Sequence, residues 1–142
     1  MNKIKFLTSL LLTIGILACS SKPEPNLELF SAEAFAFDVG DMWEVNATVN
    51  AKGFAQFDLE NNPKVDLYYK VSLITPAADT IKALFDKNIK MIPKEEVAEL
   101  PLEAQIELDS SFTAGAYTLL FDVSDEISQQ NKIIEVKFNL EY

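Results

Sequence analysis

Beyond residue 26, apolar and polar residues alternate with a period of two over most of the chain. Five segments show this pattern clearly, and the last one is the most regular. Their apolar positions are Trp43, Val45, Ala47 and Val49; Val65, Leu67, Tyr69, Val71 and Leu73; Leu102, Ala104, Ile106 and Leu108; Tyr117, Leu119, Phe121 and Val123; and Ile134, Val136, Phe138, Leu140 and Tyr142. Strict alternation predicts β-strands with one buried face and one exposed face. We therefore expect these apolar positions to form the core.

Turn-forming residues separate these segments, and weaker patterns predict further elements. The turns lie at residues 39–41, 60–63, 75–76 and 109–115. Weaker strands are predicted within residues 27–37, 54–59 and 80–92. A short helix is expected at residues 93–100, because proline and early acidic residues favour a helix start.

Seven or eight short strands separated by turns predict an all-β fold. The arrangement that fits best is an antiparallel sandwich of two sheets over residues 27–142. A closed barrel is the alternative. The uneven spacing of the strands and the interrupting segment 75–100 argue against it.

The first eighteen residues have the pattern of a secretory signal peptide. Residues 1–5 carry two lysines and no acid, and residues 6–17 are uncharged and mostly apolar. A basic start, a short apolar run and a small residue are typical of such a signal. The run is shorter than the roughly 20 apolar residues that span a bilayer. We expect residues 1–18 to be removed and to take no part in the fold, the alternative being a buried N-terminal helix.

Cys19 is the only cysteine of the chain, and the chain has no histidine. A disulfide within the chain therefore lacks a second cysteine. A zinc site usually draws its four ligands from cysteine and histidine, and a nucleophilic cysteine is most often activated by histidine. Acylation is the interpretation that is left, with pairing to another chain as the alternative.

The stretch Ile16, Leu17, Ala18 and Cys19 resembles the lipobox of bacterial lipoproteins. This resemblance implies cleavage between Ala18 and Cys19 and attachment of palmitate-type acyl chains to Cys19. Each methylene buried in the membrane contributes about 0.8 kcal/mol. Two or three acyl chains therefore anchor a protein stably, whereas a single chain gives only marginal binding. By analogy with enteric bacteria, Ser20 after the cysteine favours the outer membrane. Residues 19–26, with Pro23 and Pro25, are predicted to form an extended tether.

Composition excludes several classes of function. The formal net charge is −10, and removing residues 1–18 deletes two lysines and no acid, which makes it more negative still. An acidic chain is a poor ligand for nucleic acid or for anionic headgroups. All cationic side chains are lysine, so bidentate guanidinium clamps are unavailable. Without histidine or arginine we expect neither an enzyme nor a bound cofactor or metal.

A second resemblance covers about thirty residues near the C-terminal end of the sequence. Residues 115–119 and 121–125, followed by a polar loop and the last alternating segment, are similar to the final hairpin of immunoglobulin-like domains, including fibronectin type III modules. The resemblance implies that the hydroxyl of Tyr117 ties a corner between strands. It lacks the cysteine pair of antibody domains, and it identifies an architecture without identifying an activity.

Two groups of residues are candidate binding sites. Asp58, Glu60 and Asp66, with Asn61 and Asn62, offer the oxygen ligands that calcium requires, although any hairpin turn contains such residues. Asp122, Asp125 and Glu126 form a second acidic group with the same alternative. Tyr68 lies on the polar side of its segment and is predicted to be the exposed aromatic residue. An aromatic platform of Trp43, Phe54, Phe57, Tyr68 and Tyr69 is a further alternative.

The sequence therefore predicts a lipid-anchored binding module. We expect a non-enzymatic binding or assembly subunit of an envelope complex, with an envelope protein as partner and the membrane as its support. A surface module that binds glycan or a cation is the alternative. If the last segment, residues 132–142, lies at a sheet edge, it could accept another strand. Its outward Glu135, Lys137 and Glu141 would discourage such pairing.

Overall fold

The computed structural model describes residues 22–142 and contains seven strands. These are β1 (Glu28–Asp38), β2 (Met42–Lys52), β3 (Val65–Ile74), β4 (Thr80–Met91), β5 (Glu99–Asp109), β6 (Gly115–Asp125) and β7 (Gln130–Leu140). The predicted signal segment and Cys19 lie outside the described residues. No helix of the described part is long and apolar enough to cross a membrane.

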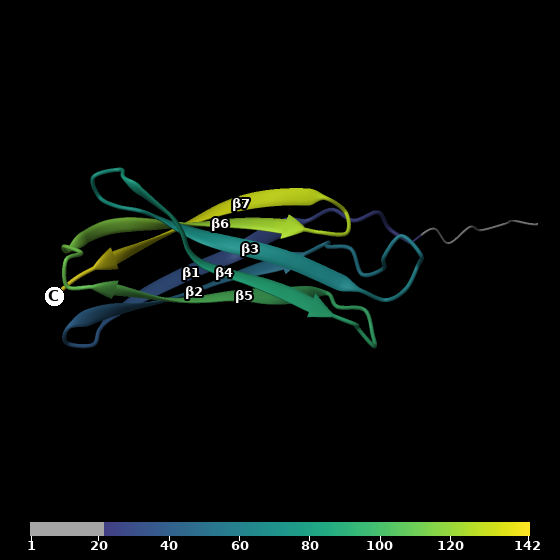
Figure 1. Cartoon of the computed structure of the whole chain (residues 1–142), viewed down its shortest axis with the longest axis horizontal. Coiled ribbons are helices and arrows are strands. Elements are labelled where there is room, and N and C mark those ends of the chain that lie inside the picture. Colours follow the sequence, from purple (N-terminus) through teal and green to yellow (C-terminus); the bar gives the residue numbers. More distant parts are fainter. Residues whose placement is uncertain (1–21) are drawn as a thin grey trace, which may run out of the picture.

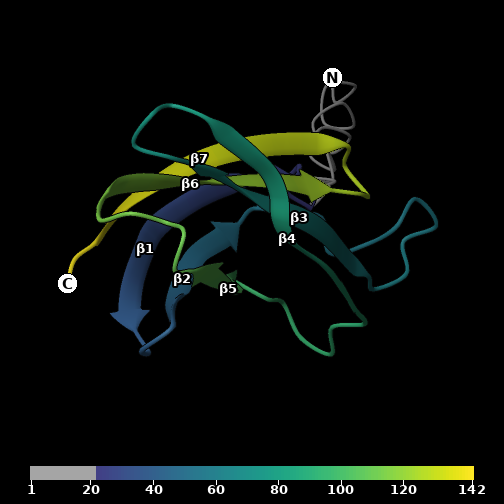
Figure 2. The same ribbon diagram turned by 60° about the vertical axis from the view of Figure 1, so that its left-hand side comes forward.

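The strands form two antiparallel sheets stacked face to face (Figures 1 and 2). One sheet has the order β1-β2-β5, and the other has the order β4-β3-β6-β7. Neighbours β2–β5 and β3–β6 come from distant parts of the sequence, which is the Greek-key connection of immunoglobulin-like sandwiches. β4 pairs with β3 in the four-stranded sheet and not with β5 in the three-stranded sheet. The predicted fold class, an all-β two-sheet sandwich with about seven strands, is confirmed.

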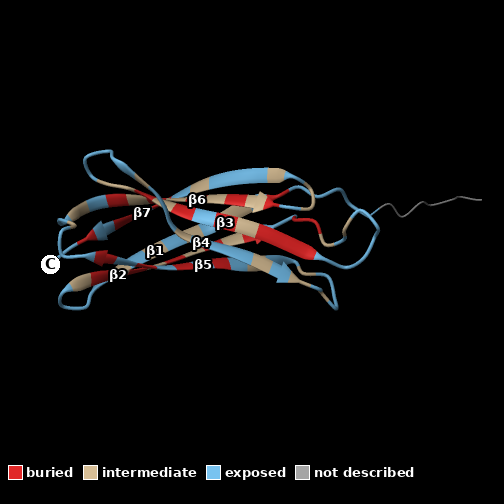
Figure 3. Cartoon of the chain, in the orientation of Figure 1, coloured by how far each residue is buried: buried red, intermediate tan, exposed pale blue. Residues whose placement is uncertain are grey.

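Alternate residues of the strands meet between the sheets and form the core (Figure 3). Every predicted apolar position in β2, β3, β5 and β6 is buried. In the last segment Val136, Phe138 and Leu140 are buried, Ile134 is half-buried, and Tyr142, which follows β7, is exposed. Fully burying one such aliphatic side chain contributes about 1.5–3 kcal/mol, so these positions dominate the stability of the fold.

Two tyrosines join parts of the sandwich through their hydroxyl groups. The Tyr117 hydroxyl donates to the carbonyl oxygen of Thr113 at 2.8 Å, as the resemblance to immunoglobulin-like hairpins implied. Tyr69, fully buried on β3, donates to the carbonyl oxygen of Glu103 on β5. Since β3 and β5 belong to different sheets, the Tyr69 hydrogen bond ties the two layers together.

The prediction of a helix at residues 93–100 is wrong. This segment is an irregular connection, and β5 has already begun at its last two residues. The Gln56 side chain accepts from the backbone N–H of Val97 at 2.7 Å and donates to the Val97 carbonyl at 2.9 Å. The N–H and carbonyl groups of Val97, which would form backbone hydrogen bonds within a helix, are therefore bonded to the Gln56 side chain instead.

The predicted strand at residues 54–59 is also absent, and the predicted partial strand in residues 80–92 is longer than expected. Residues 54–59 form part of the loop between β2 and β3, with only an isolated bridge between Phe57 and Pro63. The N–H of Ala55 donates to the carboxylate of Asp125 and not to a neighbouring strand. β4 runs for 12 residues with an irregularity opposite the step from Val71 to Leu73.

Candidate interaction surfaces

The acid Asp58 binds its own loop. Its Oδ1 accepts hydrogen bonds from the backbone N–H groups of Glu60 and Asn62, both at 2.9 Å. These bonds, above all the one from Asn62, lower the pKa of the Asp58 carboxyl below its usual value. The carboxylate therefore stabilises the turn, as Asp commonly does in such loops. Glu60 is exposed beside it.

Asp66 lies apart from this loop, as the second residue of β3, and it is buried. Its Oδ2 is 3.8 Å from the Nζ of Lys64, and its Oδ1 has no hydrogen-bond partner among the described residues. Within residues 22–142, no three acidic, histidine or cysteine side chains converge as metal ligands would. The structure therefore does not bring Asp58, Glu60 and Asp66 together as one metal site.

Asp125 of the second acidic group is a buried structural residue. Only 1% of it is exposed, and its Oδ2 accepts from the Ala55 N–H and from the Ser128 hydroxyl, both at 2.7 Å. Its Oδ1 accepts from the Ile127 N–H at 3.0 Å. The carboxylate thus holds the β2–β3 loop against the β6–β7 loop. Asp122 lies within β6, where it pairs with Lys70 at 3.3 Å.

The aromatic residues are distributed differently from the prediction. Tyr68 is half-buried, because β3 is a central strand and its neighbours Asn88 and Ser124 flank the side chain. Trp43, Phe54 and Tyr69 are buried, so the aromatic platform does not form. Among residues 22–142, the exposed aromatic residues are Phe35, Phe37, Phe57 and Tyr142.

One concave surface, which we call the loop-end groove, lies where the chain enters the sandwich. It has a volume of about 900 Å³ and is bordered by residues 22–26, 53–57 and 93–98 with Pro63. This volume falls within the range of small-molecule sites. The Lys22 ammonium lies 3.4 Å above the ring of Phe57 and 2.7 Å from Asn61 Oδ1. The chain's own cation therefore covers the exposed aromatic ring of the groove.

The entering segment is fixed to the sandwich by hydrogen bonds. The N–H of Asn26 donates to the Gly53 carbonyl at 2.8 Å. The Gln130 side chain donates to the Pro25 carbonyl and accepts from the N–H of Leu27, both at 2.8 Å. The position of the chain just before β1 is therefore set by Gly53, directly after β2, and by Gln130 of β7.

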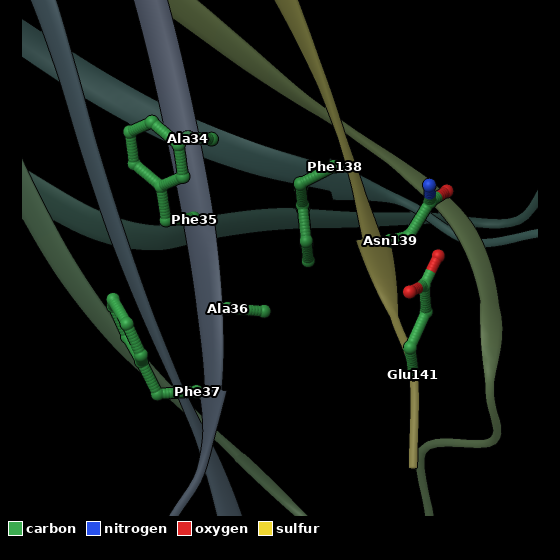
Figure 4. A pocket seen from close by; sticks show the side chains of 7 residues that line it. All are labelled: Ala34, Phe35, Ala36, Phe37, Phe138, Asn139 and Glu141. Atoms are coloured by element: carbon green, nitrogen blue, oxygen red, sulfur yellow. The ribbon is translucent and has the colours of Figure 1, made fainter.

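A second surface consists of three apolar side chains on the outer side of β1 and in the turn after it. We call Phe35, Phe37 and Val39 the aromatic strip; they are 60%, 53% and 53% exposed. The alternating Ala34 and Ala36 point to the other side of β1, toward Phe138 on β7 (Figure 4). The apolar pattern of residues 27–37 predicts only a weak strand and did not indicate this surface. The available signal was the alternation of small alanines with large phenylalanines, in which alanine is the inward residue.

A shallow cavity of about 430 Å³ lies between the edges of β1 and β7. We call it the seam cavity, and it is lined by residues 34–37 with Phe138, Asn139 and Glu141 (Figure 4). β1 and β7 approach each other, yet among the described residues no backbone ladder joins them. β7 lies at one edge of the four-stranded sheet, and β1 lies at one edge of the three-stranded sheet.

The outer face of the three-stranded sheet carries an excess of negative charge. The registers of β1, β2 and β5 place one lysine, Lys52, among the glutamates, and it pairs with Glu28 at 3.2 Å. The glutamates of this face are Glu28, Glu33, Glu44, Glu99, Glu103 and Glu107. Glu44 and Glu107 stand directly opposite each other, an arrangement that is destabilising in a sheet. This face therefore attracts cations.

Comparisons with known proteins give no family for this chain. No protein-family model matches it, and no curated protein matches it. Among solved structures, the chain is similar to a protein from Archaeoglobus fulgidus, with 14% identity and a TM-score of 0.39, over 81% of this chain and 99% of that one. It is also similar to a target of the Northeast Structural Genomics Consortium, with 12% identity and a TM-score of 0.40, over 85% and 88%. TM-scores this low do not support a shared fold, and the fold of this chain is assigned from its own strand order.

Proposed function

We propose that this chain is a lipid-anchored, non-enzymatic assembly subunit of the bacterial envelope that binds a protein partner through the aromatic strip. The exposure of Phe35, Phe37 and Val39 is the observation that carries the proposal. Contiguous exposed apolar side chains with a polar rim mark interaction sites, and aromatic residues contribute most of the binding energy at protein interfaces. The surrounding glutamates provide that polar rim.

The position of the strip suits an anchored subunit. The described chain begins at the loop-end groove, and the strip lies at the opposite end of β1 (Figure 1). At ~3.3 Å per residue, the ten steps from Leu27 to Phe37 extend over about 30 Å. An acyl anchor on Cys19, which is predicted from the lipobox resemblance, would therefore leave the strip facing away from the membrane and open to a partner.

A cross-linking experiment in intact cells tests this proposal. We expect a photoreactive amino acid at position 37 to give a discrete cross-linked species, because the side chain lies in the interface. The double variant Phe35→Ser/Val39→Ser should remove that species. The matched control is Ile133, which is 62% exposed on β7 in the other sheet. Cross-links that are equally strong from position 133, or that persist in the double variant, would contradict the proposal.

The alternative is a module that binds glycan in the loop-end groove. The volume of the groove favours it. A glycan that stacks on the Phe57 ring would displace the Lys22 ammonium that covers it. A glycan panel should then raise the melting temperature of the wild-type protein but not that of Phe57→Ala. A panel without any effect on the melting temperature would exclude this alternative.

A further inference from the structure

The edge of β1 has the features of a site that accepts an added strand. In residues 33–38 the strand is regular, contains neither proline nor lysine, and pairs on one side only, with β2. Upstream, Ser31 has a φ of 50°, and the register shifts between Phe30 and Glu33. This irregularity limits the usable edge to residues 33–38. An edge strand leaves half of its backbone N–H and C=O groups available to another chain.

The other sheet edges carry features that discourage pairing. β4 has Lys82, Lys87 and Lys90 and an irregular register near Ala83, whose φ is 51°. β5 contains Pro101, which has no N–H to donate. β7 carries Lys137 between acidic residues. Lysine, proline and bulges are the devices by which proteins block edges, and residues 33–38 of β1 have none of them.

The seam cavity provides space for the inward side chains of such a strand. Its inner wall consists of Ala34, Ala36 and the ring of Phe138 (Figure 4). The alanines leave room that larger residues would fill, since they are only half-buried and are smaller than most of the apolar side chains that β2, β3, β5, β6 and β7 bury. Apolar residues at every second position of an added strand would cover this wall and gain the usual free energy of burial.

The outward side chains of the added strand would meet a different surface. Opposite them lie Glu33, Phe35 and Phe37, and beyond these, on β2, lies Glu44. None of the described lysines pairs with Glu33 or Glu44. Charge complementarity therefore favours lysine or arginine at the outward positions, with an aromatic residue against the strip.

We propose that β1 binds an extended, basic segment of a protein partner, which adds a strand beside residues 33–38 and alternates apolar residues with basic or aromatic ones. The inference rests on the proposed function and specifies its partner. Strand addition of this kind takes its affinity from backbone hydrogen bonds and its specificity from alternate side chains.

Peptide binding to the full chain in detergent, followed by NMR of its backbone amides, tests the inference. The probe is a seven-residue peptide in which lysine or phenylalanine alternates with valine. One comparison peptide has glutamate in place of each lysine. A second is N-methylated at every residue, which removes all of its N–H donors. We expect the basic peptide to shift and protect the amides of residues 33–38. The acidic peptide should bind at least about tenfold more weakly, because like charges would then face each other, and the N-methylated peptide should lose binding.

Charge reversal provides a second readout that does not depend on the peptide backbone. The variant Glu33→Lys/Glu44→Lys should invert the preference and bind the acidic peptide more tightly. The control Glu60→Lys/Glu126→Lys makes the same change in net charge on exposed loop residues and should keep the wild-type preference.

Three results of the peptide experiments would overturn the inference. These are equal binding of the N-methylated peptide, amide shifts confined to β4, β5 or β7, and the same peptide preference in both charge-reversal variants. A concentration-dependent dimer that protects residues 33–38 without peptide would identify a second copy as the occupant and would also overturn it. If the cross-link from position 37 persists in any of these cases, the strip still binds a partner and only strand addition fails.

Discussion

Single buried polar groups decide how the loops of this protein are held. Asp125 accepts hydrogen bonds from the Ala55 N–H, the Ser128 hydroxyl and the Ile127 N–H while it is almost completely buried. A buried donor that loses its acceptor costs about 1–3 kcal/mol. The acidic residues that resembled a cation site in the sequence therefore include a residue that fixes the architecture of one end of the sandwich.

The substitution Asp125→Asn should lower the free energy of unfolding by about 2–3 kcal/mol, because the amide nitrogen cannot accept a hydrogen bond and leaves either the Ala55 N–H or the Ile127 N–H without an acceptor. Urea denaturation measures the change. The control Asp86→Asn on exposed β4 should stay within about 0.5 kcal/mol of the wild type. If the two variants were equally stable, the buried carboxylate would not hold the loops as described.

The buried phenol of Tyr69 makes the free energy of unfolding depend on pH in the alkaline range. Burial raises the pKa of its phenol from 10.0 to about 12. Since the folded-state pKa lies above the unfolded-state value, the contribution to stability is complete below pH 10 and declines as the pH rises toward 12. The free energy of unfolding should therefore fall over this interval, as measured by urea denaturation at a series of pH values.

The variant Tyr69→Phe should reduce this alkaline decline while costing about 1 kcal/mol at neutral pH through the lost hydrogen bond to Glu103. The matched control is Val71→Ala, a buried truncation on the same strand without an ionisable group. It should lower the free energy of unfolding at every pH and leave the decline at alkaline pH unchanged. An unaltered slope in Tyr69→Phe would assign the decline to other groups.

At the scale of elements, backbone geometry determines where strands begin, end and remain open. The irregularity at Ser31 limits the accessible edge of β1, and the Gln56 side chain keeps residues 93–98 out of a helix. Gly53, with a φ of +70°, lets the chain entering β1 pass against the end of β2. A Cβ at this position would lie 2.0 Å from the Asn26 carbonyl oxygen.

The substitution Gly53→Ala should therefore destabilise the protein by more than the roughly 1–2 kcal/mol that a left-handed backbone costs an L-residue. Hydrogen exchange should also show lower protection at Asn26, whose N–H bonds to the Gly53 carbonyl. Gly40→Ala is the control, because a Cβ there meets nothing within 4 Å although the φ is +107°. Its effect should be confined to stability, with protection at Asn26 unchanged. Equal loss of protection in both variants would contradict the role of the close approach.

At the scale of the whole molecule, the sandwich separates the predicted anchor from the proposed interface. The loop-end groove lies where the described chain begins, and the aromatic strip lies at the far end of β1. The aromatic strip contains no core residue, and Phe54 is the core residue that borders the loop-end groove. Changes in the anchor or in the strip should therefore not unfold the domain.

We predict that Cys19→Ala releases the protein from the membrane fraction and leaves the sandwich folded. Fractionation measures the release, and the melting temperature of the released protein measures folding. The change removes the sulfur that would carry the acyl chains, and two or three such chains account for stable anchoring. The control Ser20→Ala, one residue further on, should stay in the membrane fraction. An exported and cleaved Cys19→Ala protein that stays membrane-bound would show that the lipobox interpretation is wrong.

The sequence by itself determined the fold class and most of the core. Alternation in the segments of β2, β3, β5 and β6 identified which side chains are buried, because a period of two is a local property of an extended chain. The role of the Tyr117 hydroxyl was expected from the resemblance to immunoglobulin-like hairpins, and the structure shows that its partner is the Thr113 carbonyl. The lipobox pattern, which is also local, gave the prediction of an anchor at Cys19.

The tertiary structure alone decided which strands became neighbours and which edges stayed open. Residues distant in sequence, such as Ala55 and Asp125 or Gln56 and Val97, replaced the strand and the helix that local patterns favoured. The exposure of Phe35 and Phe37 also depends on the position of β1 at a sheet edge beside β7. Alternation shows that a strand has two faces, but only the packing of the whole chain determines which face is covered.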